Sequence, residues 1–383
     1  SSGGRNVFKP NRRECLQGIL AAASAAAMPS ISPARPAPHA AGGGDPGEEK
    51  IKICLVWGDR NPHLVKLSEQ IGVTHAIAGT SYQLSRVPRS QYVDTVAKIK
   101  SDYEAAGLTI AGIESHPVPA NKIKLGLPGR DEEIENYIAA IEALGKAGIP
   151  MVCYDFMAGI DWYRSNMHDP GRGGASTMSF NIQDAEKLGP THWGRISKEK
   201  MWSNIEYFLK AVIPVAQKAN VQMALHPDDP PVPVLRGISR IIVSPAAYRR
   251  VMSIVPSPVN GATFEMGVFS LFPGVDLKAL AREFCRDKKV FYIHARNLRG
   301  TRDNFTETFQ DNGKTDFGEM FQTFYDNGFR GPLRPDHDPI LDGEAEEAKL
   351  FHYPVHPGYG VTGKIFAVGY IKGIMASRHI PYV

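Results

Sequence analysis

Four residues that can bind a metal ion stand near the ends of four short apolar runs in the second half of the chain. They are His226, Glu265, His294 and Asp336. Two neutral imidazoles and two carboxylates make a mixed nitrogen and oxygen ligand set. Such a set suits Mn²⁺, Fe²⁺, Co²⁺ or Zn²⁺, whereas Mg²⁺ and Ca²⁺ prefer oxygen ligands alone. Any one of these residues alone would be an ordinary polar residue, but the four together predict a metal centre.

Short apolar runs alternate with longer helical patterns from residue 51 onward, and these elements must position the four residues. Eight candidate strands cover 51–57, 74–78, 108–114, 151–156, 221–226, 262–266, 290–295 and 333–336. Candidate helices cover 92–106, 131–147, 198–219, 246–254, 276–285, 317–327 and 363–377. This alternation predicts an α/β fold, a single-domain (β/α)8 TIM barrel. The carboxyl ends of barrel strands meet at one mouth, so we expect the candidate ligands to share a rim.

A doubly wound open sheet would show the same alternation. However, only Gly58 follows the first predicted strand, so the G-x-G-x-x-G pattern of dinucleotide-binding folds is missing there. Residues 161–190 are rich in Gly, Asn, Ser and Asp. They predict a long loop after the fourth strand, where barrels place lids and substrate contacts.

Charged residues close to the candidate ligands suggest further roles. Arg296 lies two residues beyond His294, so strand alternation puts both side chains on one side. A guanidinium beside a metal can hold a substrate carboxylate in a fork, and the alternative is a surface salt bridge. Asp228 and Asp229 precede two prolines. We predict that one of them orients His226, with a rigid rim loop or a helix cap as alternatives.

The first 44 residues differ in composition from the rest. The pair Arg12-Arg13 precedes a small apolar run, 18–28, and then Pro- and Ala-rich sequence. This order predicts a twin-arginine (Tat) signal peptide and flexible linker over 1–44, ahead of a catalytic domain over 45–383. A disordered tail with a chance arginine pair is the alternative. We therefore expect a periplasmic or other extracytoplasmic protein that uses the Tat export machinery and has no stable membrane insertion, since no later apolar stretch approaches 18 residues.

The charge balance excludes one class of partner. The 383 residues include 44 Lys and Arg against 40 Asp and Glu, but 1–41 hold five basic residues and one acidic residue. The remainder is balanced, unlike the clustered basicity of nucleic-acid-binding proteins. No Cys-x-x-Cys pair is present. Cys54 and Cys153 fall in predicted strands, where we expect buried free thiols.

Several motifs resemble the signature stretches of the mannonate dehydratase family, a xylose-isomerase-like TIM barrel type. They are HPDDPP at 226–231, IHAR at 293–296, RPDH at 334–337, VCYDFM at 152–157 with Asp161-Trp162, and PGY at 357–359. The resemblance covers about residues 114–373. It implies a metal-dependent lyase that dehydrates D-mannonate to 2-keto-3-deoxy-D-gluconate, with Mn²⁺ or a related ion bound.

The resemblance also implies roles for individual residues. The family's metal ligands fall on His226, His294 and Asp336, and Tyr359 matches a tyrosine implicated in catalysis. Where the family commonly has a cysteine ligand, this chain has Glu265. A harder oxygen in place of a thiolate favours Mn²⁺ over softer metals. The chain therefore resembles a divergent member of the mannonate dehydratase family, and the predicted leader indicates that this member is exported.

Three functions stay open at this point. The first is a hydro-lyase acting on D-mannonate or a related aldonate, in which Arg296 and the metal stabilise the developing negative charge. Tyr359, His337 and a metal-bound water are the candidates for the acid and the base, and the two roles are unassigned. The second is a metal-dependent sugar isomerase or epimerase of the xylose-isomerase-like superfamily, which would not need Arg296. The third is a non-catalytic extracytoplasmic sugar-binding protein. All three imply a small sugar or sugar acid as partner, and a homo-oligomer is left open.

Overall fold

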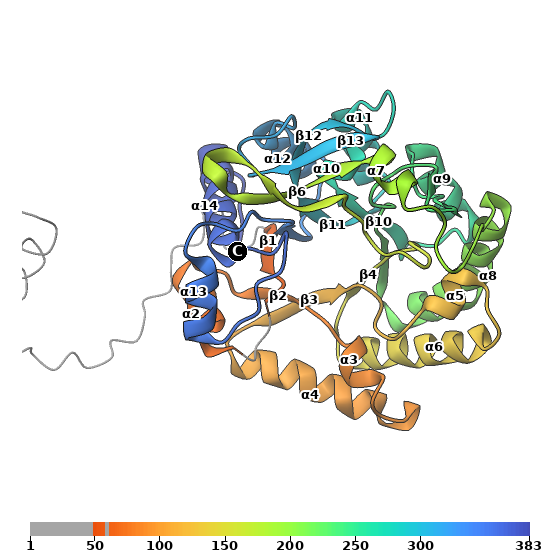
Figure 1. Cartoon of the computed structure of the whole chain (residues 1–383). Coiled ribbons are helices and arrows are strands. Elements are labelled where there is room, and N and C mark those ends of the chain that lie inside the picture. The colour runs from red at the N-terminus through yellow and green to blue at the C-terminus, as the bar shows by residue number, and fades with distance from the viewer. Residues whose placement is uncertain (1–48, 58–60) are drawn as a thin grey trace, which may run out of the picture. The chain divides into compact units, whose positions relative to one another are not determined.

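The computed structural model describes residues 49–57 and 61–383, so the predictions for 1–44 lie outside the described residues. Eight parallel strands close into a barrel (Figure 1). In order around the barrel they are β1 (Lys52–Leu55), β2 (His75–Ala78), β3 (Thr109–Glu114), β4 (Met151–Tyr154), β7 (Gln222–Leu225), β10 (Asn260–Glu265), β11 (Val290–Ala295) and β14 (Pro332–Pro335). All eight coincide with predicted strands. The closed barrel confirms the predicted TIM barrel and rules out the open sheet.

The helices between the strands cover the outside of the barrel (Figure 1). The longer ones are α2 (Pro62–Gln70), α4 (Tyr92–Ala105), α6 (Arg130–Lys146), α8 (Lys198–Ala219), α9 (Pro245–Ile254), α11 (Leu277–Arg286), α12 (Phe317–Asp326), α13 (Glu344–Phe351) and α14 (Val361–Ser377). Short helices are α3 (Ser81–Leu84), α5 (Asn121–Leu125), α7 (Ile182–Lys187) and α10 (Met266–Phe269). Every predicted helix is present, with its ends within two residues of the prediction.

Helix α8 shows why these segments fold as predicted. It begins at Ser197, whose side chain accepts a hydrogen bond from the backbone N–H of Lys200, and it ends at Asn220 with a positive φ of 55°. Between these caps, Ile205 and Leu209, four residues apart, are buried on the barrel side. The helix therefore has a start signal, a stop signal and one apolar stripe, each visible in the sequence.

A second sheet lies beside the barrel mouth and corrects the predicted loop over 161–190. Its antiparallel order is β12 (Asn297–Thr301), β13 (Asn304–Thr308), β6 (Ser176–Asn181) and β5 (Asn166–Pro170). In Figure 1, β6, β12 and β13 lie together above β10 and β11. The segment lacks a continuous apolar pattern because each strand is short and only partly buried, as in β5. Pairing across a long sequence gap orders it.

The barrel strands are buried on both faces, as expected when helices surround a parallel sheet. Every residue of β10 and β11 is buried. Side chains that alternate with those packed on the helices fill the barrel interior, among them Cys54, Met151 and Cys153. A Cβ at Gly112 would lie 2.3 Å from Cε of Met151, so glycine leaves room for the methionine. Both cysteines are free and buried, as predicted.

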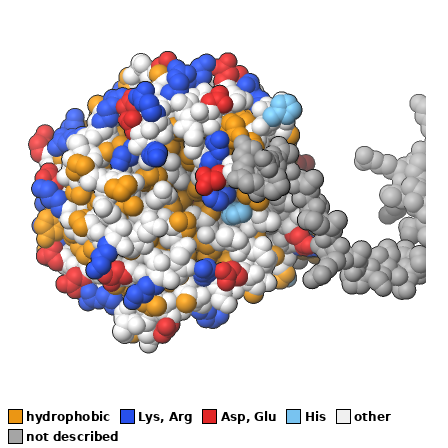
Figure 2. Space-filling model, turned by 180° about the vertical axis from the view of Figure 1, so that it is seen from behind, with side chains coloured by type: hydrophobic (Ala, Val, Ile, Leu, Met, Phe, Trp, Pro, Cys, Tyr) orange, Lys and Arg blue, Asp and Glu red, His pale blue; other side chains and the backbone are white. Residues whose placement is uncertain are grey.

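Charged side chains of both signs are interspersed over the face shown in Figure 2. This agrees with the balanced charge of the chain after residue 41. In the described part of the chain, none of the helices has the length and apolar character needed to cross a membrane.

Candidate active site

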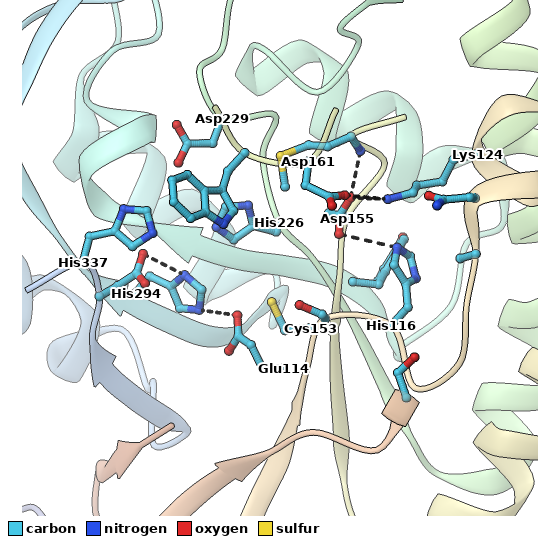
Figure 3. Close-up of a pocket in the computed structure, with 18 of the residues that line it drawn as sticks. Glu114, His116, Lys124, Cys153, Asp155, Asp161, His226, Asp229, His294 and His337 are labelled. Carbon is cyan, nitrogen blue, oxygen red and sulfur yellow. Dashed lines mark hydrogen bonds and ion pairs between the residues drawn. The ribbon is translucent and has the colours of Figure 1, made fainter. Parts of the chain in front are cut away.

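A cavity of about 340 Å³ opens at the carboxyl ends of the barrel strands (Figure 3). Residues at or just beyond the ends of β3, β4, β7, β11 and β14 line it. The predicted site residues that line this cavity are His226, His294, Arg296, Asp336, His337 and Tyr359.

Three of the four predicted metal ligands form one group. One ligand atom from each of His226, His294 and Asp336 lies within 4.8 Å of the others, and all three residues are buried. His226 directly follows β7, His294 belongs to β11 and Asp336 directly follows β14. The barrel thus brings together residues that are up to 110 positions apart in the sequence. Three protein ligands with an open position are typical of catalytic metal centres.

Glu265 has a different role from the one predicted. Its buried carboxylate caps α10, accepting hydrogen bonds from the backbone N–H groups of Gly267, at 3.1 Å, and Val268. Because α10 begins directly after β10, the first amides of the helix bind the carboxylate. Glu265 neither lines the cavity nor belongs to the ligand group. This arrangement does not support it as a fourth ligand.

The His226 ring is oriented as a metal ligand requires. Its Nδ1 lies 2.8 Å from the backbone carbonyl oxygen of Pro227, which can only accept, so Nδ1 carries the proton. Nε2 is then left with a free lone pair. Burial, together with the charges of His294 and Arg296, lowers the pKa of His226 to about 4, so the ring is neutral at pH 7.

The His294 ring has unsatisfied nitrogens. It is 1% exposed, and neither Nδ1 nor Nε2 makes a hydrogen bond within the described residues. Nδ1 lies 3.5 Å from Oδ2 of Asp336, and Nε2 lies 3.5 Å from Oε1 of Glu114. Burial and Arg334 lower the pKa of His294, but the two carboxylates outweigh them and raise it overall. The position therefore favours positive charge, and a bound cation would satisfy the ring.

Asp336 is held as a carboxylate between two arginines. Arg334 Nη1 lies 2.6 Å from its Oδ1, and Arg296 Nε donates to its Oδ2 at 2.9 Å. Burial raises the pKa of Asp336, but the two guanidinium groups lower it well below the usual value. Asp336 is therefore ionised and fixed in orientation.

Arg296 cannot take the predicted role of a fork for the substrate carboxylate. Its Nε and Nη2 donate to Asp336, its Nη1 donates to Asp229 at 2.6 Å, and the side chain is 2% exposed. The surface salt bridge alternative is excluded by the same burial. Arg296 is a positioning residue that holds the Asp336 carboxylate toward the cavity.

Replacing Arg296 with Met is expected to lower the free energy of unfolding by about 3–5 kcal/mol, because it leaves buried carboxylates without their partner. Urea denaturation followed by fluorescence would measure this. Arg302→Met is the control, since Arg302 forms a partly exposed ion pair with Asp303. That variant should change stability by less than about 1 kcal/mol. Equal losses in the two variants would contradict the assignment.

Neither Asp228 nor Asp229 orients His226, contrary to the prediction, because the Pro227 carbonyl does so. Asp228 accepts hydrogen bonds from the backbone N–H groups of Ile241 and Ile242 and so stabilises a loop. Asp229 pairs with both nitrogens of the Arg164 fork, at 2.8 Å each, and with Arg296. Asp229 thus supports the site through Arg296.

His337 is paired with a residue that the sequence did not indicate. Its Nδ1 lies 2.8 Å from Oε1 of Glu307, on β13 of the second sheet. Burial raises the pKa of Glu307, but Arg164 and His337 lower it overall, so the group is an ionised acceptor. Nδ1 of His337 therefore donates, and Nε2 is the nitrogen left without this partner. No pattern around Glu307 signals this contact, which joins segments 30 residues apart.

A second set of polar side chains lines the cavity away from the ligand group. Figure 3 shows His116, Lys124, Asp155 and Asp161 on one side of the cavity, and His294 and His337 on the other. Lys124 Nζ donates to Asp155 at 3.1 Å and to Asp161 at 3.4 Å. Nε2 of His116 makes no hydrogen bond to any residue that the structure describes and lies 3.5 Å from Asp155. Burial lowers the pKa of His116 to about 4, so this ring is neutral.

Comparison with known proteins identifies the family. The family model of D-mannonate dehydratase (UxuA) matches residues 51–194 and 191–380. The chain belongs to the D-mannonate dehydratase family. Mannonate dehydratase of Streptococcus equi subsp. zooepidemicus is 33% identical over 85% of this chain and 93% of that protein. The enzyme of Brachyspira hyodysenteriae is 33% identical over 84% of this chain and 97% of that protein.

Solved structures agree with this membership. The mannonate dehydratase of Streptococcus suis serotype 2 has a TM-score of 0.76 and 31% identity, over 87% of this chain and 97% of that one. A D-psicose 3-epimerase from Clostridium cellulolyticum H10 has a TM-score of 0.54 at 12% identity, which supports the fold alone. As a member of the D-mannonate dehydratase family, this chain is a hydro-lyase that dehydrates a sugar acid. The isomerase and sugar-binding alternatives find no such support.

Proposed function

We propose that this dehydratase converts D-mannonate, or a closely related aldonate, to the 2-keto-3-deoxy acid in the 340 Å³ cavity. His226, His294 and Asp336 hold the divalent cation that the reaction uses. The observation that carries the proposal is this buried group of three ligands inside the cavity of a chain from the matching family.

The charge of the cavity supports a cation. Five carboxylates line it against three cationic side chains, Lys124, Arg296 and Arg334. An anionic substrate would be repelled by this acidic excess, and a divalent cation would offset it. Imidazole and carboxylate ligands suit Mn²⁺, which we propose as the metal, with Fe²⁺, Co²⁺ and Zn²⁺ as competitors.

Dehydration removes a proton from the carbon beside the carboxylate and a hydroxyl from the next carbon. When bound, the divalent cation supplies positive charge that stabilises the negative charge developing on the substrate. His337 takes the proton at Nε2, because Nδ1 is engaged with Glu307. Glu307 in turn stabilises the imidazolium that forms.

Tyr359 is the proposed acid for the departing hydroxyl. Its ring centroid lies 5.3 Å from that of His337, and both residues line the cavity. Burial raises the pKa of Tyr359, so the phenol keeps its proton at neutral pH.

A product screen tests the function. Purified protein with Mn²⁺ should form a 2-keto-3-deoxy acid from D-mannonate or another member of a panel of hexonates and pentonates. Absence of keto acid from the whole panel would contradict the proposal.

We propose that the polar set around His116 binds the end of the substrate remote from the metal. His116→Phe keeps the ring but removes Nε2, so KM is expected to rise by about 3- to 10-fold, the value of one hydrogen bond, with kcat little changed. Steady-state kinetics would measure both. His63→Phe is the control, because His63 stacks on Phe351 outside this cavity and should leave KM unchanged. A fall in kcat alone would contradict this role.

We also propose export through the twin-arginine route, on the composition of residues 1–44. Replacing Arg12 and Arg13 with Lys should leave the unprocessed chain in the cytoplasm, as cell fractionation and immunoblotting would show. Arg5→Lys with Arg35→Lys changes the same number of arginines in the leader and should leave export intact. Equal export of both variants would contradict the signal.

A further inference from the structure

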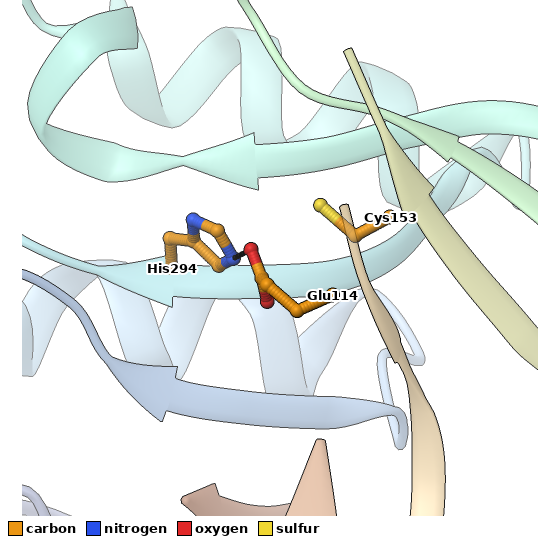
Figure 4. A group of neighbouring side chains, drawn as sticks. All are labelled: Glu114, Cys153 and His294. Carbon is orange, nitrogen blue, oxygen red and sulfur yellow. Dashed lines mark ion pairs between the residues drawn. The ribbon is translucent and has the colours of Figure 1, made fainter. Parts of the chain in front are cut away.

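A second group of possible metal ligands shares His294 with the proposed catalytic group. It consists of Glu114, Cys153 and His294, one ligand atom of each lying within 4.8 Å of the others (Figure 4). Glu114 is the last residue of β3, Cys153 lies within β4 and His294 lies within β11. Glu114 faces Nε2 of His294, whereas Asp336 faces Nδ1 on the other side of the ring. Cys153 has no part in the proposed dehydration.

The two nitrogens of His294 face different groups. Nδ1 lies 3.5 Å from Asp336, and Nε2 lies 3.5 Å from Glu114. Neither nitrogen has a hydrogen-bond partner among residues 49–57 and 61–383, although the residue is only 1% exposed. A neutral imidazole carries one proton and one free lone pair, so it can bind a metal through one nitrogen only. The two groups therefore compete for this ring.

The second group suits a soft cation. Both oxygens of Glu114 already accept hydrogen bonds, from Arg334 at 3.3 Å and from Tyr292 at 3.1 Å. A cation there must depend mainly on the cysteine sulfur and the imidazole, which are ligands for Zn²⁺ and similar metals. The positive charge of Arg334 further disfavours a cation that depends on carboxylate oxygen alone.

We propose that a thiophilic divalent cation, such as Zn²⁺ or Cd²⁺, binds at Glu114, Cys153 and His294 and thereby displaces the metal from His226, His294 and Asp336. Displacement of the catalytic metal rests on the proposed function, whereas binding of a cation at Glu114, Cys153 and His294 does not depend on it. Bound in this way, a thiophilic cation inhibits the enzyme by withdrawing His294 from the catalytic group.

The simpler view of Cys153 is a packing residue of the barrel interior. It is 2% exposed, and its sulfur accepts a hydrogen bond from Oγ1 of Thr263 at 3.2 Å. Cys54, another interior cysteine, belongs to no group of possible metal ligands among the described residues. Replacing Cys153 can therefore be compared with replacing Cys54, a buried interior cysteine outside the proposed metal site.

Titration of metal-free protein with Co²⁺ and with Cd²⁺ tests the site. The near-ultraviolet charge-transfer band of a metal–thiolate bond should appear and saturate at one equivalent. Cys153→Ser should abolish it, whereas Cys54→Ser and Cys285→Ser should keep it. No band in the wild-type protein would overturn the proposal, and so would a band that persists in folded Cys153→Ser. The wild-type result decides the matter even if that variant does not fold.

Displacement is tested on Mn²⁺-loaded protein by the electron paramagnetic resonance signal of free Mn²⁺. One equivalent of Cd²⁺ should release the bound Mn²⁺, and Cys153→Ser should need about tenfold more Cd²⁺. A thiolate band that forms while Mn²⁺ stays bound would overturn the competition. Failure of the proposed function would look different, since no Mn²⁺ would bind and no keto acid would form while the band still appeared.

Discussion

Replacing His337 with Asn is expected to lower kcat for sugar-acid dehydration by about 10²- to 10⁴-fold, the usual contribution of a general base. The imidazole that takes the proton is lost, whereas the cavity and the metal ligands remain. His337 has a positive φ of 49°, a backbone conformation that Asn tolerates, so the substitution does not strain the chain. Steady-state kinetics should show kcat and kcat/KM falling together.

His379→Asn is the matched control for this variant. His379 also has a positive φ, of 53°, but it is exposed near the carboxyl terminus. Its replacement should leave kcat unchanged. Glu307→Gln should have a smaller effect than His337→Asn, because it removes only the charge that orients the imidazole. Full activity of His337→Asn would exclude His337 as the base.

His226→Ala is expected to weaken Mn²⁺ binding by about 100-fold or more and to abolish keto-acid formation at ordinary metal concentrations. Changing groups that only support a ligand typically weakens binding by about 10- to 100-fold, and loss of a ligand should exceed this. Elemental analysis after dialysis would give the metal content. Excess Mn²⁺ should restore part of the activity, because two ligands remain.

His168→Ala controls for the loss of any histidine. His168 is exposed on β5 and belongs to neither group of possible ligands in the described residues. It should keep full metal content and activity. If His226→Ala retained one equivalent of tightly bound Mn²⁺, the ligand assignment would be wrong.

Much of the site follows from local patterns in the sequence. Short apolar runs typical of strands alternate with longer segments that have the apolar spacing of helices, so the barrel was predictable. A barrel brings the carboxyl ends of its strands together at one mouth. That rule places His226, His294 and Asp336 at one rim. The second sheet was not predictable in this way, because β6, on which β5 pairs, is itself stabilised by pairing with a distant segment, β13.

The sequence by itself determined that His226, His294 and Asp336 reach the barrel mouth, because that depends on strand order and strand ends. Only the tertiary structure decided what each charged side chain does there. Arg296 binds Asp229 and Asp336 in place of a substrate, Glu265 caps a helix, and His337 gains Glu307 as its partner. The physical reason is that a buried charge binds the nearest opposite charge or free amide, and that neighbour comes from a distant part of the chain.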